Sequence, residues 1–237
     1  MTIKFKDKYS LVALLPMKAN SERIKGKNFK SFCGKPLFRW VLDTLLSVSE
    51  IEKVIINTDA RKILSENGLV DSEKVVIRDR KPEICGDYVS MNEIIDDDIK
   101  NFNSDLYLMT HTTNPFLSKK SIEKSINAYK KGLLNKTADS LFTVNKMQER
   151  FYNSNVTPLN HDPAELIRTQ DLEPWYVENS NLYIFTKDSF AATKARIGSN
   201  PLIFETPPDE SIDIDTQNDW DFAEVMIDFY RKKGRLR

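Results

Sequence analysis

Residues 11–28, LVALLPMKANSERIKGKN, decide the fold class that we expect for this chain. The run of apolar residues at 11–15 ends at Pro16, and a long stretch rich in Lys, Arg, Asn and Ser follows it. A short apolar run that ends at a breaker is typical of a fully buried strand in a parallel sheet. Open sheets of this kind bind ligands outside the carboxyl ends of their strands. We therefore expect the polar stretch to be a loop at the ligand-binding edge of such a sheet.

This loop is predicted to bind an anion, most simply a polyphosphate. Its cationic and hydrogen-bonding side chains are Lys18, Ser21, Arg23, Lys25, Lys27 and Asn28. Neither of the glycine-rich phosphate-binding motifs, GxGxxG and GxxxxGK[ST], occurs in it. The alternative interpretation is a solvated basic loop, which is the more common meaning of an isolated run of charges.

The rest of the chain alternates between predicted strands and predicted helices. Apolar runs predict strands at residues 54–57, 74–77, 106–109, 140–144, 181–185 and 202–204. Helices are expected to begin near Pro36, Ala60, Ser90, Ser118, Lys187 and either Thr216 or Asn218. This alternation predicts an α/β fold with a doubly wound, mostly parallel sheet. Residues 145–178 interrupt the pattern, and we interpret them as an arm inserted into a single domain that spans residues 1–237.

Two of the helix starts carry specific capping predictions. Asp59 is expected to cap the helix at residues 60–66 with its side chain. Ser90 precedes Glu93 by three residues, and this spacing predicts a capping box at the start of the next helix.

The composition argues against several functional classes. Lys and Arg together number 35, as do Asp and Glu, so no overall basic charge favours binding to a nucleic acid. No apolar stretch approaches the roughly 18 residues of a membrane-spanning helix, and residues 1–10, MTIKFKDKYS, lack the apolar segment of a signal peptide. Cys33 and Cys85 show no metal-binding spacing. We expect a cytoplasmic protein with reduced thiols that binds neither nucleic acid nor membrane.

A pair of carboxylates near the end of the chain predicts a metal site. Asp213 and Asp215 lie two residues apart in SIDIDT, so in an extended segment both carboxylates point to one side. Two such carboxylates repel each other unless a cation lies between them. Mg²⁺ held by one or two carboxylates and by substrate phosphates fits this need. A solvated turn is the alternative.

Two further polar clusters follow predicted strands. Arg80 and Asp87 flank the loop after the third strand, where a surface ion pair is the alternative to a binding role. His111 follows the fourth strand in THTTNP and is interpreted as a structural histidine, with a catalytic histidine as the alternative. Because the chain shows neither an HExxH motif nor a Ser–His–Asp constellation, hydrolysis through a protein nucleophile lacks support. Lys, Asn, Ser and paired Asp side chains instead suit direct displacement at phosphorus.

Taken together, four of these segments resemble one known family. They are MKANSERIKGKN after the first strand, NTD after the second, RxxxIxxD after the third, and SIDIDTQNDWDFAE near the end. In this order, over about residues 10–230, the chain resembles the acylneuraminate cytidylyltransferases, which are the CMP-sialic acid synthetases and their relatives for other 3-deoxy-ulosonic acids. The resemblance implies a Rossmann-like fold of the nucleotide-diphospho-sugar transferase type, a homodimer, Mg²⁺ and CTP. It also implies a reaction in which the anomeric hydroxyl of a sugar acid attacks the α-phosphate of CTP and pyrophosphate leaves.

The resemblance assigns roles to individual residues. It implies catalytic roles for Asn28, Lys27 and Asp215, and metal binding by Asp213 and Asp215. It implies nucleotide binding by Lys18, Ser21, Arg23, Lys27, Asn28, Arg80 and Asp87. The arm would cross to a dimer partner and bring Arg168, with Gln170 beside it, to the carboxylate of the sugar acid. The general base stays open, with Asp215 as one choice.

The first loop departs from the family's usual sequence at three positions. Lys18 stands in place of Arg, Asn20 in place of Gly, and Glu22 in place of Lys. These departures leave two alternatives open, namely a nucleotidyltransferase for another base or a sugar phosphate, and a catalytically silent nucleotide- or sugar-binding homologue. The pattern does not name the sugar acid among sialic, legionaminic, pseudaminic and Kdo-like acids.

Overall fold

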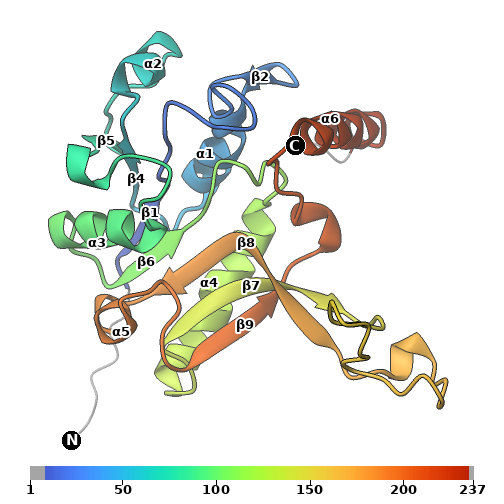
Figure 1. Cartoon of the computed structure of the whole chain (residues 1–237). Coiled ribbons are helices and arrows are strands. Elements are labelled where there is room, and N and C mark those ends of the chain that lie inside the picture. The colour runs from blue at the N-terminus through green and yellow to red at the C-terminus, as the bar shows by residue number, and fades with distance from the viewer. Residues whose placement is uncertain (1–8, 235–237) are drawn as a thin grey trace, which may run out of the picture.

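A seven-stranded sheet with helices on both faces forms the body of the protein (Figure 1). The computed structural model describes residues 9–234. The strand order is β5-β4-β1-β6-β8-β7-β9. Strands β5, β4, β1 and β6 are parallel to one another, and β8 runs antiparallel to its neighbours β6 and β7. The prediction of a mostly parallel, doubly wound sheet is therefore confirmed.

Most elements follow the predicted runs, but β7 and β8 extend beyond them into residues 145–178. The sheet contains β1 (Leu11–Leu14), β4 (Lys53–Thr58), β5 (Val75–Asp79), β6 (Leu106–Met109), β7 (Ser140–Met147), β8 (Trp175–Phe185) and β9 (Pro201–Glu205). The helices are α1 (Leu37–Ser47), α2 (Arg61–Glu66), α3 (Met91–Asn101), α4 (Lys119–Leu134), α5 (Lys187–Thr193) and α6 (Gln217–Lys232). Short 3₁₀ turns occur at η1 (Pro82–Ile84), η2 (Thr169–Asp171) and η3 (Pro208–Glu210). A small ribbon of β2 (Ser31–Phe32) and β3 (Lys35–Pro36) was not predicted, because two-residue strands show no apolar period.

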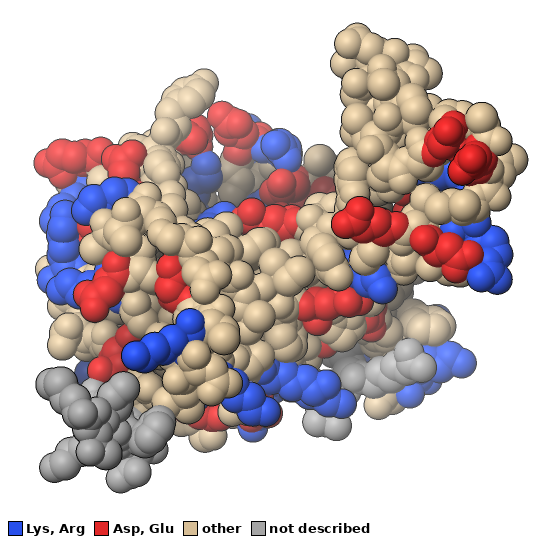
Figure 2. All heavy atoms as spheres, turned by 90° about the horizontal axis from the view of Figure 1, so that it is seen from below, with Lys and Arg blue, Asp and Glu red and all other residues tan. Residues whose placement is uncertain are grey.

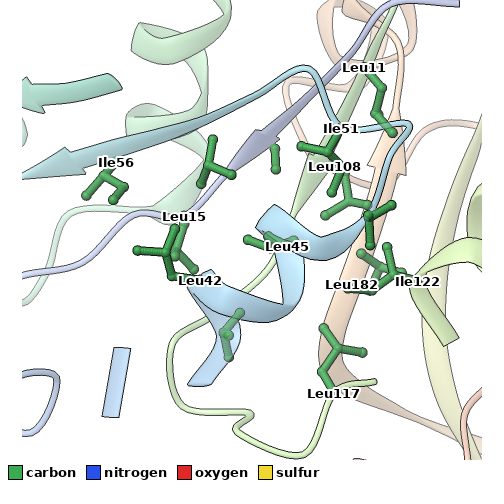
Figure 3. Close-up of a cluster of buried hydrophobic side chains, with 14 of the residues drawn as sticks. Leu11, Leu15, Leu42, Leu45, Ile51, Ile56, Leu108, Leu117, Ile122 and Leu182 are labelled. Carbon is green, nitrogen blue, oxygen red and sulfur yellow. The ribbon is translucent and has the colours of Figure 1, made fainter. Parts of the chain in front are cut away.

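The central strand β1 is apolar throughout because both of its faces are covered. Leu11 and Ala13 belong to a core cluster with side chains of α1 and α4, part of which Figure 3 shows. Val12 and Leu14 point to the opposite face, where they join side chains of α3 and α5. Alternating residues thus enter two separate cores, which explains why the run shows no polar alternation.

The two capping predictions have different outcomes. Asp59 does not cap α2, so that prediction is wrong; its Oδ1 instead accepts a hydrogen bond from the backbone N–H of Ala19, at 2.7 Å. Ser90 is the N-cap of α3, but its hydroxyl accepts from the backbone of Asn92, and the predicted capping box is not formed. At the C-terminal helix, Thr216 is the N-cap and forms a capping box with Asp219.

The inserted segment at residues 145–178 has a regular base. Strand β7 continues to Met147 and β8 begins at Trp175, so the base of the arm is a two-stranded antiparallel ribbon. Figure 1 shows the arm, in yellow and orange, extending away from the sheet. The rings of Phe151 and Trp175 stack with their centroids 5.0 Å apart. Several large apolar side chains of the arm are exposed, namely Val156, Leu159, Leu166, Ile167, Tyr176 and Val177.

The topology fixes where a ligand can bind. Strand β1 lies between β4 and β6, so the chain crosses to opposite sides of β1 at this point of the sheet. Crevices at the carboxyl ends of strands occur where the strand order reverses in this way. The loops after β1, β5 and β6 therefore converge, and they carry the polar segments at residues 17–28, 80–87 and 110–114.

Two further features of the described residues bear on partners. No helix among residues 9–234 is both long and apolar enough to cross a membrane. On the face that Figure 2 shows, Lys and Arg side chains are interspersed with Asp and Glu rather than gathered into one basic surface. Nothing on that face resembles the continuous basic patch that nucleic-acid-binding proteins present.

Candidate active site

A cavity of about 320 Å³ lies at the predicted edge of the sheet. It is lined by residues of the loop after β1, of the segments after β5 and β6, and of the loop before α6. The lining includes four cationic side chains, namely Lys18, Arg23, Lys27 and Arg80. Three acidic side chains lie among them, namely Glu22, Asp87 and Asp215. The cavity therefore combines an excess of positive charge with carboxylates that can hold a cation.

Lys27 joins the first loop to the segment before α6. Its ammonium group donates to the backbone carbonyl of Ile214 at 2.6 Å and to Oδ1 of Asp215 at 2.9 Å. Arg23 reaches the other oxygen of the same carboxylate at 3.1 Å. Partial burial opposes ionisation of Asp215, but the hydrogen bond and charge of Lys27, together with Arg23, hold the pKa of this carboxyl below its usual value. Asp215 is therefore an anion that forms ion pairs with two of the cavity's cations.

Asn28 is buried beside Lys27 and is held at both ends of its amide. Its Nδ2 donates to the backbone carbonyl of Lys18 at 2.8 Å, and its Oδ1 accepts from the hydroxyl of Thr112 at 2.7 Å. One proton of the amide nitrogen remains for a ligand in the cavity. Ser21 also lines the cavity.

Lys18 and Arg80 both line the cavity and are held by different partners. Lys18 forms an ion pair with Asp87, across the gap between the loop after β1 and the loop before α3. Arg80 does not pair with Asp87; its Nε donates to Oδ1 of Asn57 at 3.0 Å, and its Nη2 donates to backbone carbonyls. The alternative interpretation, a surface ion pair between Arg80 and Asp87, is therefore wrong. Both side chains nevertheless line the cavity.

Asp213 and Asp215 are separated by a residue that points into the protein. Ile214 is fully buried in a cluster with α6, and Ile212 packs against the same cluster. Burial, with the charge of Asp215 as a further cause, raises the pKa of Asp213. Its Oδ1 is buried and has no hydrogen-bond partner among the described residues. An orphaned carboxylate oxygen beside a second carboxylate is a donor set that suits Mg²⁺.

The protein alone offers few metal ligands at this place. Within residues 9–234, no three His, Cys, Asp or Glu side chains come together in a group that could hold a metal ion. Mg²⁺ keeps several waters and is commonly held by one or two carboxylates together with substrate phosphates. Of the two carboxylates, Asp215 alone lines the cavity where a nucleotide could complete the site, and Asp213 could supply its unpartnered oxygen as a second ligand.

His111 lines the wall of the cavity. Its Nε2 lies 3.3 Å from Nη1 of Arg196, and the guanidinium of Arg196 lies over the ring of Tyr183 at 3.8 Å from the centroid. Burial, followed by the charge of Arg196, lowers the pKa of His111 to about 4. Because Arg only donates hydrogen bonds, Nε2 accepts and the ring proton is carried by Nδ1. The residue interpreted as a structural histidine thus borders the site as a neutral imidazole.

The two residues expected at the sugar lie outside this cavity. Arg168 is at the start of η2 in the arm, where its Nε donates to Oδ2 of Asp171 at 2.7 Å. The backbone carbonyl of Gln170 accepts from the side chain of Gln148 at 3.1 Å. Neither side chain lines the cavity of its own chain.

Two residues beneath the site have no role predicted from the sequence. Asn57 and Asp98 are buried and hydrogen-bonded to each other behind Arg80. A signal was present for Asp98, because it continues the apolar stripe of Ile94 and Ile95 at helical spacing. A carboxylate on the buried face of a helix requires a partner, and Asn57 in the quoted NTD segment is one.

The chain matches known proteins over nearly its whole length. The sequence profile of a family described as "Cytidylyltransferase" matches residues 12–231. N-acylneuraminate cytidylyltransferase of Oncorhynchus mykiss is 27% identical over 236 residues, which cover 93% of this chain and 51% of that protein. Pseudaminic acid cytidylyltransferase of Campylobacter jejuni subsp. jejuni is 24% identical over 226 residues, which cover 91% of this chain and 95% of that protein. The chain spans about half the length of the fish protein and nearly all of the bacterial one.

A solved structure shares the fold. CMP:2-keto-3-deoxy-manno-octonic acid synthetase complexed with CTP superimposes with a TM-score of 0.62 at 13% sequence identity. The superposition covers 92% of this chain and 98% of that chain. Since the family profile extends from β1 to α6, this chain belongs to the cytidylyltransferase family.

Proposed function

We propose that this chain transfers CMP from CTP to the anomeric hydroxyl of an acidic 3-deoxy-ulosonic sugar of the sialic acid type and releases pyrophosphate. The observation that carries the proposal is the meeting of Lys18, Arg23 and Lys27 with Asp215 in one cavity. The cavity lies at the carboxyl ends of the strands, where this class of sheet binds nucleotides. Family membership and the sugar acids in the names of the relatives support the choice of substrates.

The proposed roles follow from charge and position. Lys18, Arg23 and Lys27 receive the triphosphate, while Ser21 and Asn28 donate hydrogen bonds to it. Arg80 and the segment to Asp87 border the base. Transfer at phosphorus requires positioned positive charge rather than a protein nucleophile, and the cavity offers such charge. The free amide proton of Asn28 is available where negative charge develops on the α-phosphate.

Asp213 and Asp215 are the proposed ligands of Mg²⁺. When bound, this ion neutralises phosphate charge and orients the triphosphate. Asp215 would exchange its bonds to Lys27 and Arg23 for the metal, which frees both cations to contact phosphate. Asp213 contributes the buried oxygen that has no partner among the described residues.

The arm is proposed to complete the site of a second copy in a homodimer. Its exposed apolar side chains need a cover, and a second copy can supply one symmetrically. Arg168 is exposed on the arm and can leave Asp171 for the carboxylate of a sugar acid, to which a guanidinium offers a bidentate match. Gln170 lies beside it.

The first prediction concerns the substrates. With Mg²⁺ and a panel of sugar acids, we expect pyrophosphate release with CTP and with one or more 3-deoxy-ulosonic acids, measured by a coupled phosphate assay. GTP, UTP and ATP, and neutral sugar phosphates as acceptors, serve as controls. Equal turnover with other nucleotides would contradict the assignment of the base, and turnover with a sugar phosphate would contradict the assignment of the acceptor. Binding of CTP without turnover on any acceptor would identify a silent homologue.

The second prediction separates binding of the nucleotide from turnover at Asp215. We expect Asp215→Asn to lower kcat by on the order of 10²-fold, because it removes a charged metal ligand that acts chiefly in the transition state. Binding of CTP without metal should stay equal or become tighter, since Lys27 and Arg23 lose their competing carboxylate. Calorimetry and steady-state kinetics measure the two quantities. Asp221→Asn, at an exposed site on α6, is the control. Unchanged turnover at saturating Mg²⁺ would contradict the metal assignment.

The third prediction concerns the arm. Arg168→Ala should raise KM for the sugar acid by about 10- to 100-fold, as expected for loss of a hydrogen-bonded ion pair, and should leave KM for CTP within about twofold. Lys187→Ala, an exposed cation on α5, is the matched control. Light scattering should report a dimer at micromolar concentration. A monomer would contradict the exchange of arms, and an unaltered KM for the sugar acid would leave Arg168 with a structural role.

A further inference from the structure

We propose that Asp98 and Asn57 are positioning residues that fix the guanidinium of Arg80 in the nucleotide cavity. The inference rests on the proposed function, because it assigns Arg80 to the nucleotide. Neither residue touches the cavity; Asp98 lies on the buried face of α3 and Asn57 lies near the end of β4. They act through a chain of hydrogen bonds that ends at Arg80.

The hydrogen bonds that link Asp98 to Arg80 pass through a single residue, Asn57, and the first two residues of this series are buried. Asp98 and Asn57 are both 0% exposed. Nδ2 of Asn57 donates to Oδ1 of Asp98 at 2.9 Å, and Oδ1 of Asn57 accepts from Nε of Arg80 at 3.0 Å. The amide of Asn57 therefore lies directly between a buried carboxylate and the guanidinium that borders the cavity.

The carboxylate determines which way the amide of Asn57 points. An ionised carboxylate only accepts hydrogen bonds, so the nitrogen end of the amide has to face Asp98. The oxygen end then faces Arg80, which only donates. Without an acceptor at residue 98, the amide nitrogen loses its partner and Arg80 alone still opposes the flipped amide, which would set Nδ2 against Nε of Arg80. Two donors facing each other in a dry site would displace the guanidinium.

The remaining bonds of Arg80 show what this orientation achieves. Its Nη2 donates to the backbone carbonyls of Asn57 at 2.8 Å and Met17 at 3.2 Å. These contacts tie β5 to the segment after β1 on the wall of the cavity. Among the hydrogen bonds of residues 9–234, none involves Nη1 of Arg80, which leaves this donor for a ligand. Asn57 thus uses one edge of the guanidinium and leaves the other available.

The same helix supplies a matched control. Asp97 and Asp98 are adjacent, both are buried, and both pair with Arg78. Asp97 also pairs with Lys81 at 2.5 Å, but no hydrogen bond joins it to Asn57 or Arg80 among the described residues. Loss of Asp97 therefore removes a comparable buried ion pair without touching the chain of bonds that leads to the cavity.

The test compares binding of CTP by three variants, measured by calorimetry at pH 8. This pH lies above the pKa of Asp98, which burial raises to about 6. Asp98→Leu should raise the Kd of CTP about tenfold or more, because it removes the acceptor that orients Asn57. Asp98→Asn keeps an acceptor oxygen and should stay within about threefold of the wild type. Asp97→Leu should lower thermal stability but leave the Kd of CTP unchanged.

A double-mutant cycle with Arg80→Lys keeps the proposal testable if Asp98→Leu does not fold. Arg80→Lys removes the contact of Nε with Asn57. Asp98→Asn should change the Kd of CTP slightly in the wild type and should not change it in the Arg80→Lys variant. Equal Kd values for Asp98→Leu and Asp97→Leu, or an additive cycle with a measurable effect of Asp98→Asn, would overturn the positioning role. Failure of the wild type to bind CTP would instead overturn the proposed function.

Discussion

The ion pair between Lys27 and Asp215 is the contact on which the geometry of the site depends. It joins two segments 188 residues apart, and its ammonium group is also bonded to the backbone beside Asp215. Ile24 of the first loop is buried in the same apolar cluster as Ile214, so this packing acts together with the ion pair to hold the loop near the segment before α6. Two further contacts hold the segment before α6 in place. The side chain of Asp219 accepts a hydrogen bond from the backbone N–H of Asp215, and Ile214 is buried against α6. The C-terminal helix thereby holds the acidic segment against the loop that follows β1.

Carboxylates within the cavity offset part of its positive charge. Lys27 and Arg23 share Asp215, and Lys18 pairs with Asp87. Cations placed this close together repel one another, and these carboxylates offset that repulsion. Apart from Lys27, the paired side chains are substantially exposed to solvent, and exposed ion pairs contribute little to stability. In the proposed function, a triphosphate would therefore replace these carboxylates at small cost, and Asp215 would become available to a metal at the same step.

The sequence was informative wherever one element alone determines the structure. Buried strands such as β1 and β4, and most helix starts, follow from local pattern, and the four polar segments follow from the position of strand ends in a parallel sheet. Contacts between elements were not predictable in this way. Asp59 stands at a position where an N-cap residue is expected, but its carboxylate accepts a hydrogen bond from the backbone N–H of Ala19 instead. Lys18 pairs with Asp87 and Arg80 with Asn57 because of how three loops converge, and no local period encodes that convergence.

The central claim is that CTP takes the place of the protein's own carboxylates at the carboxyl ends of the strands. A crystal structure of the chain with CTP and Mg²⁺ tests this most directly. We expect the triphosphate to contact Lys18, Arg23 and Lys27, with the ion pairs to Asp87 and Asp215 broken. A structure in which CTP binds elsewhere, or in which both ion pairs stay intact beside the bound nucleotide, would contradict the account.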